Sequence, residues 1–192
     1  MHAPRFKAVL TCAAAASIVL AALPAARAVD GPAPDRNNHR AMLDMATAYR
    51  VTAKYQNERA AIADGYIRTD DCMSNKRGPG AMGYHYLNPS RWGSTDPSRP
   101  TSLIYGAEKG PGGRKLYAVE WQVSDPDQNL ATHEGRPTMF GLPFDGPMPG
   151  HTPGMPIHFD LHMWGYKDNP QGRFHNWNLN VTCPAPSSHE HS

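Results

Sequence analysis

The chain has 192 residues, a length that suits one domain of ordinary size. It carries 19 Lys and Arg against 17 Asp and Glu, a formal net charge of +2. Three of the basic residues and none of the acidic ones lie in the first 28 positions, so the rest of the chain has 16 basic and 17 acidic residues, a net charge of −1. This balance does not indicate a nucleic-acid-binding protein, which would need a clustered basic face.

Residues 1–28 have the pattern of a secretory signal peptide. Arg5 and Lys7 precede the apolar and small residues 8–23, and Ala26-Arg27-Ala28 then fits a small-x-small cleavage site. The apolar run is shorter than the roughly 20 residues that a membrane span requires. We therefore expect an exported protein, periplasmic or secreted, that is soluble and has no membrane contact after cleavage.

Asp35 to Asp64 is predicted to form one long helix. Small and apolar residues recur at steps of three and four, and they predict an inward face that includes Ala53. Asp35 is placed to cap the start of this helix, and Gly65 is placed to end it. The small residues on the inward face would let the helix lie close to a sheet.

Beyond Cys72, Gly and Pro become frequent and the pattern changes to short strands separated by turns. Strands are expected at 82–87, 102–105, 114–123 and 179–182, and the turn Gly110-Pro111-Gly112-Gly113 predicts an antiparallel hairpin over 102–123. The segment 135–156 holds six prolines and five glycines, which excludes a central strand and predicts an ordered loop wrapped over the sheet. The polar tail 184–192 is expected to be disordered.

Residues 156–166 are the most informative stretch, because they alternate with a period of two. The apolar set is Ile157, Phe159, Leu161 and Met163, and the polar and aromatic set is His158, Asp160, His162, Trp164 and Tyr166. Such alternation predicts a strand with one face in a core and the other facing something polar. On a flat strand, His158 and His162 would lie about 13 Å apart, too far to share one ion. Asp160 could share an ion with one flanking histidine, but without a bulge it would lie too far along the strand to accept a hydrogen bond from the His162 ring.

Glu120 is the best candidate to share the polar face with His162, since it is a charged residue in the apolar strand 114–123. His85, between two tyrosines in the strand 82–87, is a third candidate. Two histidines and one carboxylate commonly bind divalent zinc, iron or manganese, with an open position for water or substrate. Two alternatives remain open: a hydrogen-bonded, partly solvated surface, and a metal-free acid/base pair.

A second, overlapping group of candidate ligands is formed by Asp160, His158 and His151. The surrounding stretch is also rich in methionine, and thioether and imidazole ligands together suit copper. The residues of this Met/His-rich run are Met148, His151, Met155, His158, His162 and Met163. The alternative is that these methionines only fill gaps beneath the proline-rich loop.

Two cysteines, Cys72 and Cys183, remain once the signal peptide is removed. In the oxidising environment of an exported protein they are expected to form a disulfide, with two free thiols or thiolate ligands as the alternative. A different function is also open, that of a non-catalytic binding or structural module that holds a sugar or small apolar ligand. Its ligand face would be lined by the aromatic residues Trp164, Tyr166, Phe174 and Trp177, together with Asn176, Asn178 and Asn180.

A series of short motifs resembles a set of uncharacterised small exported bacterial proteins. The motifs are GYHY at 83–86, VEW at 119–121, DLHMW at 160–164, NPQGRF at 169–174 and WN at 177–178, followed by Cys183. The resemblance covers roughly residues 80–183. It implies an exported bacterial domain and no particular activity.

These observations predict a single α+β domain over residues 29–183. A long N-terminal helix packs on a small, mostly antiparallel β-sheet that is closed by one disulfide. The predicted function is binding of a divalent metal, with zinc, iron and copper as candidates, through His162, Glu120 and His85. Whether the protein is an enzyme is left open.

Overall fold

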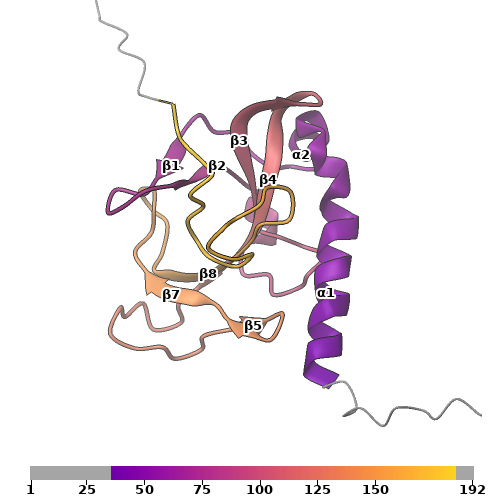
Figure 1. The fold of residues 1–192 in the computed structure, drawn as a ribbon. Coiled ribbons are helices and arrows are strands. Elements are labelled where there is room, and N and C mark those ends of the chain that lie inside the picture. Colours follow the sequence, from indigo (N-terminus) through magenta and orange to yellow (C-terminus); the bar gives the residue numbers. More distant parts are fainter. Residues whose placement is uncertain (1–35, 185–192) are drawn as a thin grey trace, which may run out of the picture. The chain divides into compact units, whose positions relative to one another are not determined.

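The computed structural model describes residues 36–184, which form an α+β fold (Figure 1). A curled, fully antiparallel sheet has the strand order β1-β2-β3-β4-β8-β7. Its strands are β1 (Cys72–Ser74), β2 (Ala81–Leu87), β3 (Ser102–Gly110), β4 (Gly113–Ser124), β7 (Asp145–Met148) and β8 (His158–Met163). A separate two-stranded pair consists of β5 (Thr138–Met139) and β6 (Leu142–Pro143). The expected signal peptide, the capping residue Asp35 and the tail beyond Pro184 lie outside the described residues.

The expected continuous helix over Asp35–Asp64 is wrong, because the helix breaks at Asn57. Its pieces are α1 (Arg36–Thr52), the 3-10 turn η1 (Ala53–Gln56) and α2 (Glu58–Ala63). Asn57 has an extended backbone, with φ −89° and ψ 107°, and its side chain accepts a hydrogen bond from the backbone N of Arg59. This is the bond that an N-cap makes, so Asn57 begins a new helix and does not continue the old one.

The helix α1 packs on the sheet through a face that coincides only in part with the expected one, since Met45 and Tyr49 do pack against the core. Ala48 and Thr52 are completely buried, and Oγ1 of Thr52 lies 2.8 Å from the hydroxyl of Tyr166. Ala53, expected on the inward face, is exposed. Because alanines occur on both sides of this helix, their spacing does not distinguish the buried side from the exposed one.

Most of the expected strands are present in the structure. The expected strands at 82–87, 102–105 and 114–123 appear as β2, β3 and β4, and β3 and β4 form the expected hairpin. The segment 179–182 is not a strand; beside it, Asn178 makes only an isolated bridge to Ala81. The proline-rich segment 135–156 does contribute a strand, β7, but at the edge of the sheet, where proline is tolerated.

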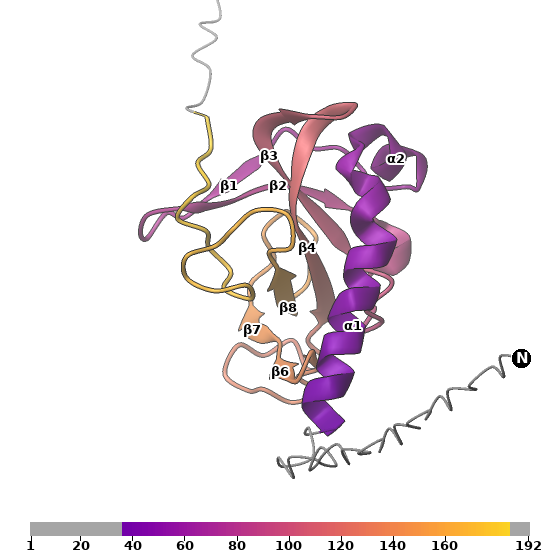
Figure 2. The same cartoon turned by 45° about the vertical axis from the view of Figure 1, so that its right-hand side comes forward.

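One face of the sheet packs against the helical segment, and Figure 2 shows α1 lying along it beside β4. This side forms the larger core cluster, with fully buried side chains at alternate positions of the central strands. Val119 and Trp121 of β4 and Leu161 and Met163 of β8 belong to it. The residues between them on these strands therefore point to the opposite face, where the candidate ligands lie.

Because the helix breaks at Asn57, Glu58 lies at the turn of the β3–β4 hairpin. Glu58 is only 1% exposed, and its carboxylate accepts hydrogen bonds from the hydroxyl of Tyr86, from Nη1 of Arg68 at 3.0 Å and from the backbone N of Arg114 at 2.9 Å. This buried carboxylate therefore has partners on both oxygens. It ties the second helix to β2 and β4.

The predicted disulfide is confirmed. Cys72 of β1 and Cys183 are bonded, with their Cα atoms 5.6 Å apart, so the alternative of free thiols or thiolate ligands does not hold. Within residues 36–184, no helix combines the length and the apolar character needed to cross a membrane.

Candidate metal centre

The register of the sheet places His85, Glu120 and His162 on one face. Glu120 of β4 pairs with His162 of β8 on one side and with Ser102 of β3 on the other, and Ser102 pairs in turn with Leu87 of β2. Residues two apart on a strand share a face, so His85 lies on the same side as Leu87. Three different strands thus supply the three expected ligands, with the small side chain of Ser102 between two of them.

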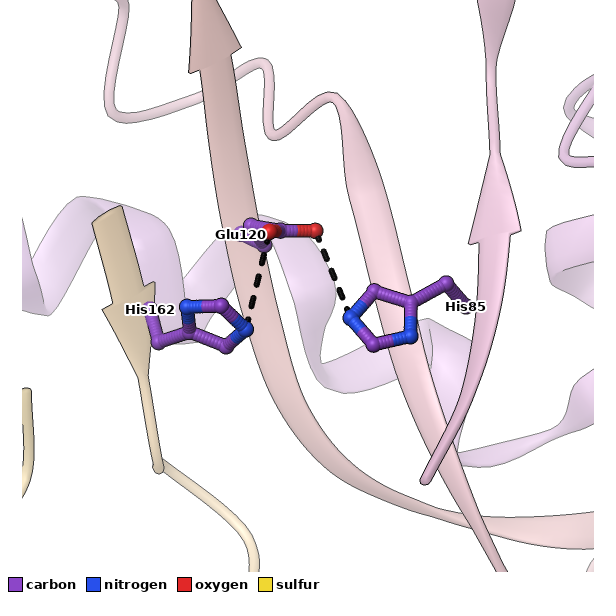
Figure 3. Close-up of side chains that lie close together, drawn as sticks. All are labelled: His85, Glu120 and His162. Carbon is purple, nitrogen blue, oxygen red and sulfur yellow. Dashed lines mark ion pairs between the residues drawn. The ribbon is translucent and has the colours of Figure 1, made fainter. Parts of the chain in front are cut away.

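The three side chains converge, as Figure 3 shows. Nε2 of His162 lies 3.5 Å from Oε1 of Glu120, and Nε2 of His85 lies 3.7 Å from Oε2 of the same carboxylate. These separations are too long for good hydrogen bonds. Two ligand atoms that each sit about 2.1 Å from one tetrahedral ion would be about 3.4 Å apart. The spacing is compatible with three ligands around one ion.

The second expected group, His151, His158 and Asp160, also comes together. One donor atom from each lies within 4.8 Å of the others, as in the first group. His158 and Asp160 are on β8, whereas His151 comes from the loop after β7, and the rings of His151 and His158 meet at 86° with centroids 5.0 Å apart. Six side chains thus form two adjoining trios.

Asp160 lies between the two trios and, as expected, it is too far from the His162 ring to accept a hydrogen bond from it. Its Oδ1 is 3.9 Å from Nδ1 of His162. His158 and His162 nevertheless belong to different trios, as their separation along the strand predicts.

Most of the cluster is buried without hydrogen-bond partners. His158, Asp160 and His162 have no exposed surface and Glu120 is 1% exposed, while His85 is half-buried and His151 is exposed. The described chain offers no hydrogen-bond partner to seven buried atoms of the cluster: Nδ1 of His85, Oε2 of Glu120, Nε2 of His158, both carboxylate oxygens of Asp160 and both ring nitrogens of His162. Each unsatisfied group costs about 1–3 kcal/mol, a cost that a bound cation would offset.

Burial also sets the protonation of the cluster. Desolvation lowers the pKa of His85 and of His158 to about 4, and it lowers the pKa of His162 well below its ordinary value. Desolvation and the neighbouring Asp160 raise the pKa of Glu120 well above the usual range, and burial raises the pKa of Asp160 to about 8. The imidazoles are therefore neutral near pH 7, which is the form that binds metal ions.

A cavity of about 240 Å³ adjoins both trios. His85 of the first trio and His151 of the second lie in its wall, together with Gln122 and Met155. The rest of the lining is largely apolar and includes Leu87. A ligand in this cavity would contact one residue of each trio.

Sequence reasoning missed three polar residues of this face. Ser102 and Gln122 are buried, and the hydroxyl of Ser102 donates to Oε1 of Gln122 at 2.9 Å. Their alternation with apolar residues in the predicted hairpin could have revealed both. Asp145 of β7 pairs with Asp160 of β8, but it lies in the proline-rich segment where no strand was expected.

The Met/His-rich run that suggested copper is divided by the fold. Met163 lies in the core on the helix side of the sheet, away from the histidines. Met148 pairs with His158 across β7 and β8, and Sδ of Met155 accepts a hydrogen bond from the backbone N of His151 at 3.3 Å. Two of the methionines therefore stay near the second trio.

The aromatic residues proposed for a ligand face do not form one surface. Trp164 packs in a small second core, whereas Tyr166 and Phe174 pack against the larger one, with the Phe174 ring stacked on Phe140 at 5.6 Å. Trp177 lines an open groove elsewhere, beside Phe174. Two of the four aromatic side chains, Phe174 and Trp177, therefore share a groove, and Asn176 lies in its wall with them.

Comparison of the chain with protein-family models, with curated proteins and with solved structures finds no match.

Proposed function

We propose that the protein is exported and binds a divalent transition metal ion through His85, Glu120 and His162. Imidazole and carboxylate ligands suit zinc, iron and copper. Three protein ligands leave at least one position for water or for a molecule in the adjoining cavity. The disulfide supports an oxidising compartment.

The observation that carries the proposal is the contrast between two equally buried glutamates. Glu58 and Glu120 are each 1% exposed. Both oxygens of Glu58 accept hydrogen bonds, whereas Oε2 of Glu120 has no partner among the described residues and faces the imidazole of His85. Since this fold satisfies a buried carboxylate elsewhere, the unsatisfied group between two neutral histidines indicates a place for a cation.

Metal content tests the proposal. The protein would be purified from the periplasm without a histidine tag, desalted, and assayed for zinc, iron and copper by mass spectrometry, before and after loading at micromolar concentration. We expect bound metal in the native protein and loss of the ion at this trio in His85→Ala and His162→Ala. His133, which is exposed and belongs to neither trio, provides the matched control His133→Ala.

Circular dichroism of each variant would separate loss of ligation from loss of the fold. His85→Ala is the more informative of the two variants. His85 is only half-buried, so its removal disturbs the interior less than removal of His162 does. A native protein that holds no ion under these conditions, or a folded His85→Ala that holds as much as the control, would exclude the proposed function.

A further inference from the structure

We propose that the cluster is a two-metal centre, in which a second divalent transition metal ion binds at His151, His158 and Asp160. The proposal goes beyond the single ion of the proposed function and depends on different ligands. Two imidazoles and a carboxylate suit the same class of ion, zinc or copper above all.

Asp160 supplies the negative charge of this site. It has no exposed surface, and neither of its carboxylate oxygens has a hydrogen-bond partner among the described residues. Asp145 lies opposite it across β7 and β8, and Glu120 lies nearby on β4. Among the described residues, the only basic side chain within 4 Å of the Asp160 carboxylate is the neutral ring of His162, at 3.9 Å. Three acids thus gather where a cation would offset their charge.

His158 is oriented as a metal ligand. Its Nδ1 lies 3.1 Å from the carbonyl oxygen of Pro156, so Nδ1–H donates to that carbonyl and the lone pair is left on Nε2. Nε2 is buried and has no partner within residues 36–184. Metal-binding histidines are commonly held by such a bond from the second ring nitrogen, which sets the tautomer and the direction of the ring.

His151 completes the trio from the solvent side. It is exposed, and it lies on the loop between β7 and β8. The loop is held locally, because the backbone N of His151 donates to Sδ of Met155 and the backbone N of Ile157 donates to Oε1 of Gln128 at 2.9 Å. An ion at this trio therefore has a solvent-exposed ligand, whereas the first trio has none.

Metal stoichiometry tests the second site. Metal-free protein would be titrated with zinc, and separately with copper(II), against a chromophoric chelator, and the bound ions would be counted by mass spectrometry after desalting. We expect two ions per native chain, one in His151→Ala, one in His85→Ala and two in the control His133→Ala. Because His151 is exposed, its replacement should leave the fold intact, and His158→Gln serves as a second variant.

Failure of this inference and failure of the proposed function give different results. One ion per native chain, lost in His85→Ala and retained in His151→Ala, overturns the second site and leaves the first. One ion that is lost in His151→Ala and retained in His85→Ala supports the second site and overturns the first. Two ions that remain in both His151→Ala and His158→Gln place the second ion elsewhere and overturn the inference, as does a native chain without metal.

Discussion

Oδ1 of Asp160 lies 3.9 Å from Nδ1 of His162, so a single carboxylate faces both trios. In the metal-loaded protein, Asp160 would bind the second ion and also fix the ring that binds the first. We predict that Asp160→Asn lowers the affinity for both ions, with a loss of about 10–100-fold at the first, the size expected when a residue that orients a ligand is removed. His151→Ala should weaken only the second ion.

Competition titrations with a chromophoric chelator measure both affinities. The first-site Kd of Asp160→Asn is the deciding quantity. If it equals that of the native protein, the contact with His162 has no role in ligation.

Glu120→Gln should separate a metal ligand from a structural ion pair. Burial raises the pKa of Glu120 well above its usual range, which favours the protonated carboxyl in the metal-free protein. The neutral amide should therefore change the free energy of unfolding of the metal-free protein by less than about 1 kcal/mol. With zinc at a hundredfold excess over Kd, the native protein gains about 2.7 kcal/mol, and the variant should lose most of that gain.

Denaturant unfolding with zinc and with EDTA measures both quantities for Glu120→Gln. A structural ion pair would produce the same loss in the two conditions, and that result would contradict ligation.

Zinc binding should strengthen with pH between about 6 and 8, and it should release protons. Asp160 has a pKa raised to about 8 by burial, so an incoming ion must displace its proton below that value. His85 and His158, with pKa values of about 4, are already neutral in this range and do not compete. Calorimetry in two buffers of different ionisation enthalpy gives the number of protons released. A Kd that is constant from pH 6 to 8 would contradict the assignment of Asp160.

The inward face of α1 can be tested with two aspartates. Ala48 is completely buried against the sheet, whereas Ala46, two residues earlier, is exposed. We predict that Ala48→Asp costs roughly 3–5 kcal/mol, because it places an unpaired charge in the core. Ala46→Asp should cost less than about 1 kcal/mol, which is the scale of helix propensity. Urea denaturation of the two variants decides the point; equal losses would mean that the packed face is wrongly assigned.

Gly113 should not tolerate alanine, because a Cβ there would lie 1.4 Å from Oε2 of Glu58. The carboxylate would have to move and would lose its bond to the backbone N of Arg114, so Gly113→Ala should cost roughly 3 kcal/mol or more. Gly154 has a positive φ of 83° but no atom within 4 Å of its Cβ position. Gly154→Ala should therefore show only the backbone strain, about 1–2 kcal/mol. The difference in stability between Gly113→Ala and Gly154→Ala, measured by thermal unfolding, gives the steric contribution at Gly113.

Local pattern was sufficient to predict the strands and the faces of the candidate site. Alternation along β8 separated the apolar side from His158, Asp160 and His162, and alternation along β4 separated Glu120 from its apolar neighbours. The pairing of Glu120 with His162 follows once the two strands are neighbours. Period two is a local property, so it can be read without knowledge of the fold.

Global geometry was not predictable in the same way. The approach of Asp160 to within 3.9 Å of the His162 ring depends on the orientation of the two side chains, which the local pattern does not give. The break at Asn57 depends on contacts with distant residues, because Glu58 must reach Tyr86 and Arg114. The edge strand β7 arises within a proline-rich segment only because β8 offers it a partner.

The disulfide joins residues 111 positions apart, and all six candidate ligands, from His85 to His162, lie between its two cysteines. A protease that cuts the largely exposed stretch 126–135 would separate His85 and Glu120 from the other four ligands in the backbone. The two fragments would remain one covalent molecule, and the proposed metal centre would keep ligands from both. A nicked protein should therefore migrate as a single species until a reductant is added.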